Sequence, residues 1–141
     1  ALAQAQAEGI AEADPTLDID GWDAANKLVI LANSVLGLPV TLADVEVEGI
    51  RGVRIEALQR AQAEGSAIKL LATAAQAGDG YKLAVRPTTI PLTHPLARLT
   101  ADQMGIIYYT DVQGTIAAVA GQQGVLTTAG AMLRDVVAIC G

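Results

Sequence analysis

The chain has 141 residues, of which 52% are hydrophobic and 17% charged, and its net charge is −6 at pH 7. This composition is typical of one folded domain and excludes an intrinsically disordered chain. The nine lysine and arginine residues form no basic stripe, so we expect no nucleic-acid partner. The most apolar segment, Leu28 to Val40, is interrupted by polar residues and is too short to span a bilayer, so we expect no membrane partner either.

The single cysteine, Cys140, cannot form a disulfide within the chain, which favours a cytoplasmic location. The sequence contains no basic segment followed by an apolar one, the pattern of a secretory signal. The chain begins with Ala1 in a helical pattern, so we expect residues 1–141 to be a single domain of a longer protein.

Helices and an acidic loop are predicted for the first third of the chain. Residues 1–9 favour a helix, and Ile10 to Gly21 reads as a loop. From Trp22 to about Leu36 the apolar spacing predicts an amphipathic helix that Gly37 and Pro39 end. Its predicted buried face consists of Ala24, Leu28, Leu31 and Val35.

The middle of the chain changes from helical to strand periodicity. Thr41 to Gly49 predicts a short strand, and Arg54 to Glu64 predicts a second helix. Ser66 to Ala75 and Tyr81 to Arg86 predict two strands joined by the turn 78–80.

The last third begins with an irregular segment punctuated by Pro87, Pro91 and Pro95, with a helical turn at residues 94–96. Two further strands, a glycine loop and a final helix follow. Their expected bounds are Met104 to Asp111, Thr115 to Ala120, Gly121 to Val125, and a helix capped by Thr127 or Thr128 that runs to about Cys140. Hairpins imply antiparallel pairing, so we predict an α+β fold in which a mostly antiparallel sheet is covered by helices on one face.

Carboxylates concentrate between Ile10 and Asn33, where no basic residue precedes Lys27. The five are Glu12, Asp14, Asp18, Asp20 and Asp23. Asp20 is expected to cap the following helix, and Asp23 lies four residues before Lys27 on one helical face. A partly buried lysine there can exchange a proton with a substrate hydroxyl, and carboxylates can bind a substrate ammonium. The alternative is an ordinary surface ion pair.

The same stretch carries a longer motif. Glu-x-Asp-Pro, an aspartate, Gly-x-Asp and Lys-Leu-Val-Ile-Leu-Ala follow one another at residues 12–32. LPVTLADVEVEGI, AIKLLA and PLTHPLA come later in the chain. Together these segments resemble the homoserine dehydrogenase family over nearly the whole chain, and their length makes the resemblance specific.

The resemblance implies the reversible oxidation of L-homoserine to aspartate 4-semialdehyde with NAD or NADP, in threonine, methionine and isoleucine biosynthesis. It assigns proton transfer to Lys27 with Asp23 beside it, and binding of the substrate ammonium to Glu12 and Asp18. Asp14 and Asp20 are interpreted as structural. The family's proteins are homodimers, so a homodimer is expected here.

The cofactor is expected to bind mainly outside this chain. No Gly-x-Gly-x-x-Gly motif follows a strand at the start of the sequence, so we expect the dinucleotide-binding domain to lie elsewhere and the isolated chain to be inactive. Gly121 and Gly124 are candidates for a cofactor contact, because a loop that opens a helix can bind phosphate through its N–H groups. A plain turn is the alternative.

Two other functions are suggested by parts of the sequence. With Gly21 at the sixth position of an EF-hand loop, Asp18 and Asp20 occupy ligand positions, but the twelfth position is Lys27 instead of glutamate, which argues against a calcium site. A non-catalytic oligomerisation module, pairing through Met104 to Ala120, is compatible with an enzyme.

Overall fold

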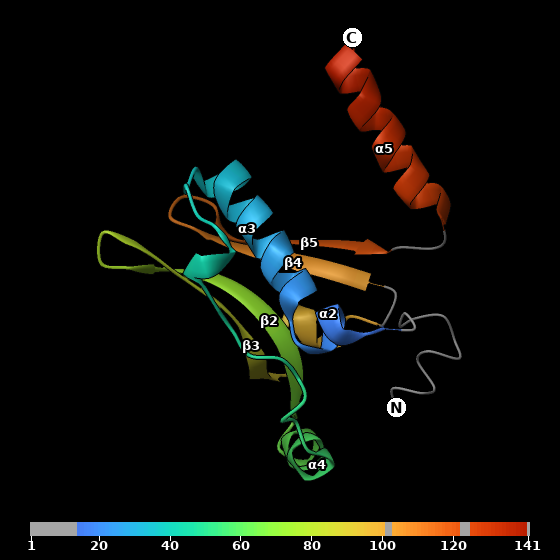
Figure 1. Ribbon diagram of the computed structural model, residues 1–141. Helices are drawn as coiled ribbons and strands as arrows, with labels where there is room; N and C mark the ends of the chain where they lie inside the picture. The colour runs from blue at the N-terminus through green and yellow to red at the C-terminus, as the bar shows by residue number, and fades with distance from the viewer. Residues whose placement is uncertain (1–13, 101–102, 122–124, 141) are drawn as a thin grey trace. The chain divides into compact units, whose positions relative to one another are not determined.

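The computed structural model describes residues 14–100, 103–121 and 125–140. The predicted N-terminal helix and the first part of the acidic loop therefore lie outside the described residues. The chain divides into two compact units, with the boundary in sequence between Leu92 and Thr93, and each is described by itself below (Figure 1). No helix in the described part of the chain has the length and apolar character needed to cross a membrane.

The first unit combines helices with a three-stranded mixed sheet. Its elements are α2 (Thr16–Ile19), α3 (Trp22–Leu36), the 3-10 turn η1 (Leu42–Asp44), β1 (Val45–Val47), α4 (Ile55–Ala63), β2 (Ser66–Ala77) and β3 (Gly80–Pro91). The strand order is β1-β3-β2. The predicted hairpin is confirmed as the antiparallel β2–β3 pair, whereas β1 pairs with β3 in parallel.

The helix α3 has the predicted bounds, and it ends at Gly37, whose φ of 65° permits the left-handed C-cap. Its predicted buried face is only partly correct. The side chains buried against the sheet residues are Ala25, Leu28 and Ala32, while Leu31 and Val35 are exposed. The helix is apolar on several sides, so periodicity alone did not single out the face on which two alanines allow a close approach to the sheet.

The strand β3 continues through Pro87 to Pro91, where an irregular segment was predicted. Proline is tolerated in a strand where its missing N–H leaves no ladder bond unmade. The register meets this condition, because β1 pairs with β3 only from Leu83 to Val85. Beyond Val85, β1 forms no pairs along its edge of β3. Pro87 and Pro91 are paired with β2, which lies along the opposite edge of β3.

The second unit contains an antiparallel hairpin and a helix. Its elements are η2 (Pro95–Arg98), β4 (Gln103–Thr110), β5 (Gly114–Gly121) and α5 (Val125–Cys140). The predicted helical turn is confirmed as η2, which His94 caps by accepting a hydrogen bond from the Leu96 N–H at 3.3 Å. The expected caps Thr127 and Thr128 are wrong, because α5 begins before them at Val125. Together the two units confirm the predicted α+β class.

Candidate functional site

The acidic segment forms a helical turn where a loop was predicted. Asp14 accepts a hydrogen bond from the Thr16 N–H at 3.1 Å and one from the Thr16 hydroxyl, directly before α2. These Thr16 hydrogen bonds lower the pKa of the Asp14 carboxyl. Asp14 thus has the structural role expected of it. We call residues 14–23 the acidic turn.

The sequence had suggested that Asp20 caps α3, but this prediction is wrong. The N-cap of α3 is Gly21, and the Asp20 carboxylate instead accepts hydrogen bonds from Nε and Nη2 of Arg51, the second at 3.1 Å. The hydrogen bond from Arg51 lowers the pKa of Asp20. The pair connects residues 31 positions apart, so local spacing gave no sign of it.

Two glycines allow the acidic turn to lie against the segment that follows β1. Gly21 has a φ of 83°, and a Cβ there would come within 3.2 Å of Val85. At Gly49 a Cβ would lie 2.3 Å from the Ile19 carbonyl oxygen. A backbone hydrogen bond of 2.8 Å from the Ile50 N–H to the same Ile19 carbonyl oxygen stabilises this close approach.

Lys27 and Asp23 form the predicted pair on the first two turns of α3. The Lys27 Nζ donates to Asp23 Oδ2 at 2.7 Å. The side chains are 56% and 44% exposed, so the expected partial burial of Lys27 is wrong for this chain. The cause is the position of Lys27 on the helix, since α3 turns Ala25 and Leu28 toward the core instead. An exposed ammonium beside a carboxylate remains accessible to a ligand.

The remaining predicted site residues are placed as follows. Asp18 lies in α2 and is exposed, and its carboxylate makes no ion pair or hydrogen bond with any residue that the structure describes. Gly121 ends β5 in the second unit. Glu12 and Gly124 lie outside the described residues. Asp18 and Asp23 thus both belong to the acidic turn, and Lys27 follows it on α3.

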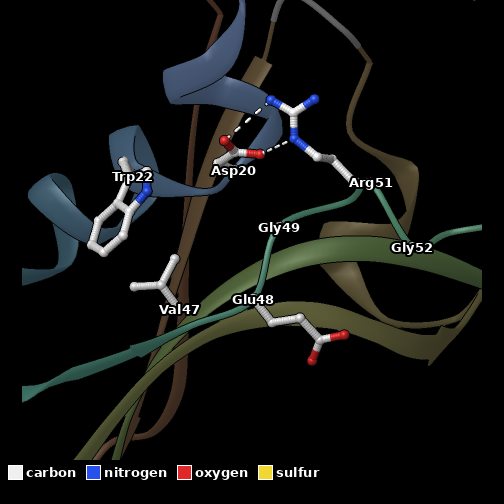
Figure 2. A pocket seen from close by; sticks show the side chains of 7 residues that line it. All are labelled: Asp20, Trp22, Val47, Glu48, Gly49, Arg51 and Gly52. Carbon is white, nitrogen blue, oxygen red and sulfur yellow. Dashed lines mark hydrogen bonds and ion pairs between the residues drawn. The ribbon is translucent and has the colours of Figure 1, made fainter.

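A shallow, open cavity of about 460 Å³ lies beside the junction of α2 and α3 (Figure 2). Its lining residues are Asp20, Trp22, Val47, Glu48, Gly49, Arg51 and Gly52. Of the predicted catalytic and substrate-binding residues that the structure describes, Asp18, Asp23 and Lys27, none is among them. Figure 2 shows the Arg51 guanidinium reaching over to Asp20. Arg51 was not predicted as a site residue, because the segment that carries the resemblance ends one residue before it.

The calcium alternative finds no support in this geometry. Thr16 to Ile19 is helical, and Arg51 holds the Asp20 carboxylate that would have been a ligand. Within the described ranges, no cluster of three or more histidine, cysteine, aspartate or glutamate side chains is arranged to bind a metal ion.

Comparison with known proteins decides the family. The homoserine dehydrogenase family profile matches residues 1–137. The chain belongs to the homoserine dehydrogenase family. Homoserine dehydrogenase of Methanocaldococcus jannaschii is 41% identical over 139 residues, which cover 99% of this chain and 40% of the relative. An NAD(+)-dependent homoserine dehydrogenase of Pseudomonas canavaninivorans is 34% identical, with coverage of 99% and 40%.

Solved structures of the family agree with the fold. The chain superposes on the crystal structure of Staphylococcus aureus homoserine dehydrogenase with a TM-score of 0.90 and 32% identity, covering 99% of this chain and 35% of that one. A homoserine dehydrogenase structure from Thiobacillus denitrificans gives a TM-score of 0.90 at 37% identity, with coverage of 96% and 32%. The chain therefore spans about a third to two fifths of the length of the homoserine dehydrogenases it matches.

Proposed function

We propose that the protein containing this chain catalyses the reversible oxidation of L-homoserine to aspartate 4-semialdehyde, a step in the biosynthesis of threonine, methionine and isoleucine in the cytoplasm. The chain supplies the substrate-binding and catalytic domain, and is inactive without its cofactor-binding partner domain. The observation that carries this proposal is the exposed Lys27–Asp23 pair, 2.7 Å apart beside the acidic turn, in a member of the homoserine dehydrogenase family.

Lys27 exchanges the hydroxyl proton of the substrate. Oxidation of the alcohol removes that proton and a hydride from the adjacent carbon, and a lysine in its neutral form can accept the proton at Nζ. Asp23, whose Oδ2 already accepts a hydrogen bond from Nζ, orients the amine and stabilises its protonated form. In the reverse direction the same ammonium returns the proton to the aldehyde oxygen.

Asp18 and Glu12 bind the substrate ammonium. The Asp18 carboxylate is exposed and has no partner among the described residues, so it is available for a charge-assisted hydrogen bond with a ligand. Glu12 is assigned the same role from its place in the family motif. Two carboxylates bind the cationic end of an amino acid and leave its hydroxyl end free to approach Lys27.

The cofactor is NAD or NADP, which when bound takes up or supplies the hydride. Gly121 and Gly124 are the candidates in this chain for a contact with it, and a Cβ at Gly121 would meet no protein atom within 4 Å. We propose that a domain outside this chain binds most of the cofactor and that the protein is a homodimer.

The test compares the parent protein with its Lys27→Ala variant in homoserine-dependent NAD(P)H formation, followed by absorbance. Loss of proton transfer is expected to lower kcat by about 10²- to 10⁴-fold. Lys82→Ala is the matched control, because Lys82 is also 56% exposed and also pairs with a carboxylate, Glu46 at 3.1 Å. Equal activity of the two variants would remove Lys27 from the chemistry, and a folded parent without homoserine turnover would refute the proposed reaction.

A further inference from the structure

Within the acidic turn, hydrogen bonds between Thr16 and Asp14 hold the start of α2, but its core contacts are few. Its helix α2 is a single turn of four residues, and none of the four is buried. So short a helix is unstable unless other parts of the molecule hold it. The turn also gathers Asp14, Asp18, Asp20 and Asp23, whose like charges repel one another. Contacts with other segments must therefore determine its position.

The segment after β1 makes those contacts. The Ile50 N–H binds the last carbonyl of α2, and one residue later Arg51 binds the Asp20 carboxylate through two nitrogen atoms. A guanidinium that binds a carboxylate through two donors restricts its orientation as well as its distance. The segment after β1 thus constrains both the position and the orientation of the junction between α2 and α3.

The charge of Arg51 acts on both ends of α2. It binds Asp20 at the C-terminal end, and its positive charge also favours the ionised form of Asp14 at the other end, in addition to the larger effect of Thr16. Asp18, the proposed ligand of the substrate ammonium, lies between them. Arg51 thereby offsets the negative charge of the two carboxylates on either side of Asp18 in sequence, and it makes no ion pair with Asp18 itself.

We propose that Arg51 is a positioning residue of the homoserine site. It holds the acidic turn so that Asp18 lies at the correct distance from the Asp23–Lys27 pair on α3, and the substrate spans the two. This inference rests on the proposed function and adds a residue to it that acts through Asp20 and touches no substrate. Because Arg51 is 61% exposed, its effect is sensitive to salt.

The experiment measures steady-state kinetics of the parent enzyme carrying Arg51→Ala, with homoserine and NAD(P) varied separately. We expect KM for homoserine to rise about 10- to 100-fold, as for a displaced binding group, with kcat changed less and KM for the cofactor unchanged. Arg54→Ala is the matched control, since Arg54 lies three residues away and its exposed side chain pairs with no described residue. It should leave all three constants unchanged.

Two further variants separate positioning from general stability. Arg51→Lys keeps the charge but loses the two-donor geometry, so its KM for homoserine should be intermediate. The exchange Asp20→Arg with Arg51→Asp rebuilds the pair in reverse and should recover most of the lost affinity, whether or not Arg51→Ala folds. No recovery in a folded exchange variant, or an unchanged KM in a folded Arg51→Ala, would overturn the inference. Homoserine turnover by the unmodified enzyme and its loss in Lys27→Ala report separately on the proposed function.

Discussion

Asp20 and Asp23 are three residues apart, yet one pairs with a basic residue that is distant in sequence and the other with a basic residue on its own helix. Asp23 binds Lys27 within one helix, and Asp20 binds Arg51 from the segment after β1. The hydrogen bond from Arg51 holds the pKa of Asp20 below its ordinary value of 3.8. A carboxyl group whose pKa is lowered by folding stabilises the folded protein at pH values above its ordinary pKa. This stabilisation is lost as the pH falls through the lowered pKa of the folded state.

Asp20→Asn should therefore make the fold less sensitive to acid. The amide cannot ionise, so the variant is less stable at neutral pH, but its melting temperature should fall less than that of the unmodified protein between about pH 5 and pH 2. Thermal unfolding followed by circular dichroism across this range measures the difference. Asp79→Asn, in the exposed turn between β2 and β3, serves as the control. Parallel curves for the unmodified protein and Asp20→Asn would contradict the assigned role of the Arg51 contact.

At the scale of the elements, α2 lies so close to the segment after β1 that no side chain fits at Gly49. Gly49 is there because the Ile19 carbonyl and the Asp20 backbone occupy the space of a side chain. Both obstructing groups are backbone, so neither can rotate away as a flexible side chain would. Gly52, in the same segment, has nothing within 4 Å of the position of a Cβ.

Gly49→Ala should destabilise the protein by about 1–3 kcal/mol, because the added methyl group pushes α2 away. Gly52→Ala should change the free energy of unfolding by much less. Urea unfolding of both variants gives the two values. The displacement also moves Asp18, so Gly49→Ala should raise KM for homoserine in the parent enzyme. Equal stabilities of the two variants would show that the close approach does not persist in solution.

For the whole molecule, we propose that the homodimer forms through the β4–β5 hairpin. One face of the hairpin contains the side chains of Met104, Ile106, Tyr108, Ile116, Ala118 and Ala120, by the alternation of the strands and their register. Met104 and Ile116 on this face are exposed. A surface that pairs with its own copy about a two-fold axis needs such an apolar patch.

Ile116→Glu should convert the parent protein from dimer to monomer, because it places one buried charge from each subunit at the proposed interface. Light scattering coupled to size-exclusion chromatography gives the mass. Val112→Glu introduces the same charge in the exposed turn of the hairpin and should leave the mass unchanged. A dimer that survives Ile116→Glu would place the interface elsewhere.

Most of the local structure could be predicted from the sequence. Gly37 and the apolar period defined α3, Gly78 and Gly80 marked the β2–β3 turn, and the four-residue spacing brought Lys27 to Asp23. Each of these features depends on residues only a few positions apart, and the local backbone conformation sets how such residues lie relative to one another. The motif around Lys27 was also long enough to predict the family, which the comparisons confirm.

Contacts between distant segments could not be predicted in this way. The continuation of β3 through Pro87 depends on how little of it β1 covers, and the face of α3 that is buried depends on where two alanines meet the sheet. Local sequence was enough to predict α3, the β2–β3 hairpin and the Asp23–Lys27 pair, because each depends on residues close together in the chain, whereas α2 was predicted as a loop. The contact of Arg51 with Asp20 and the close approach of α2 to Gly49 could be seen only in the folded molecule, because both bring together segments about 30 residues apart in sequence.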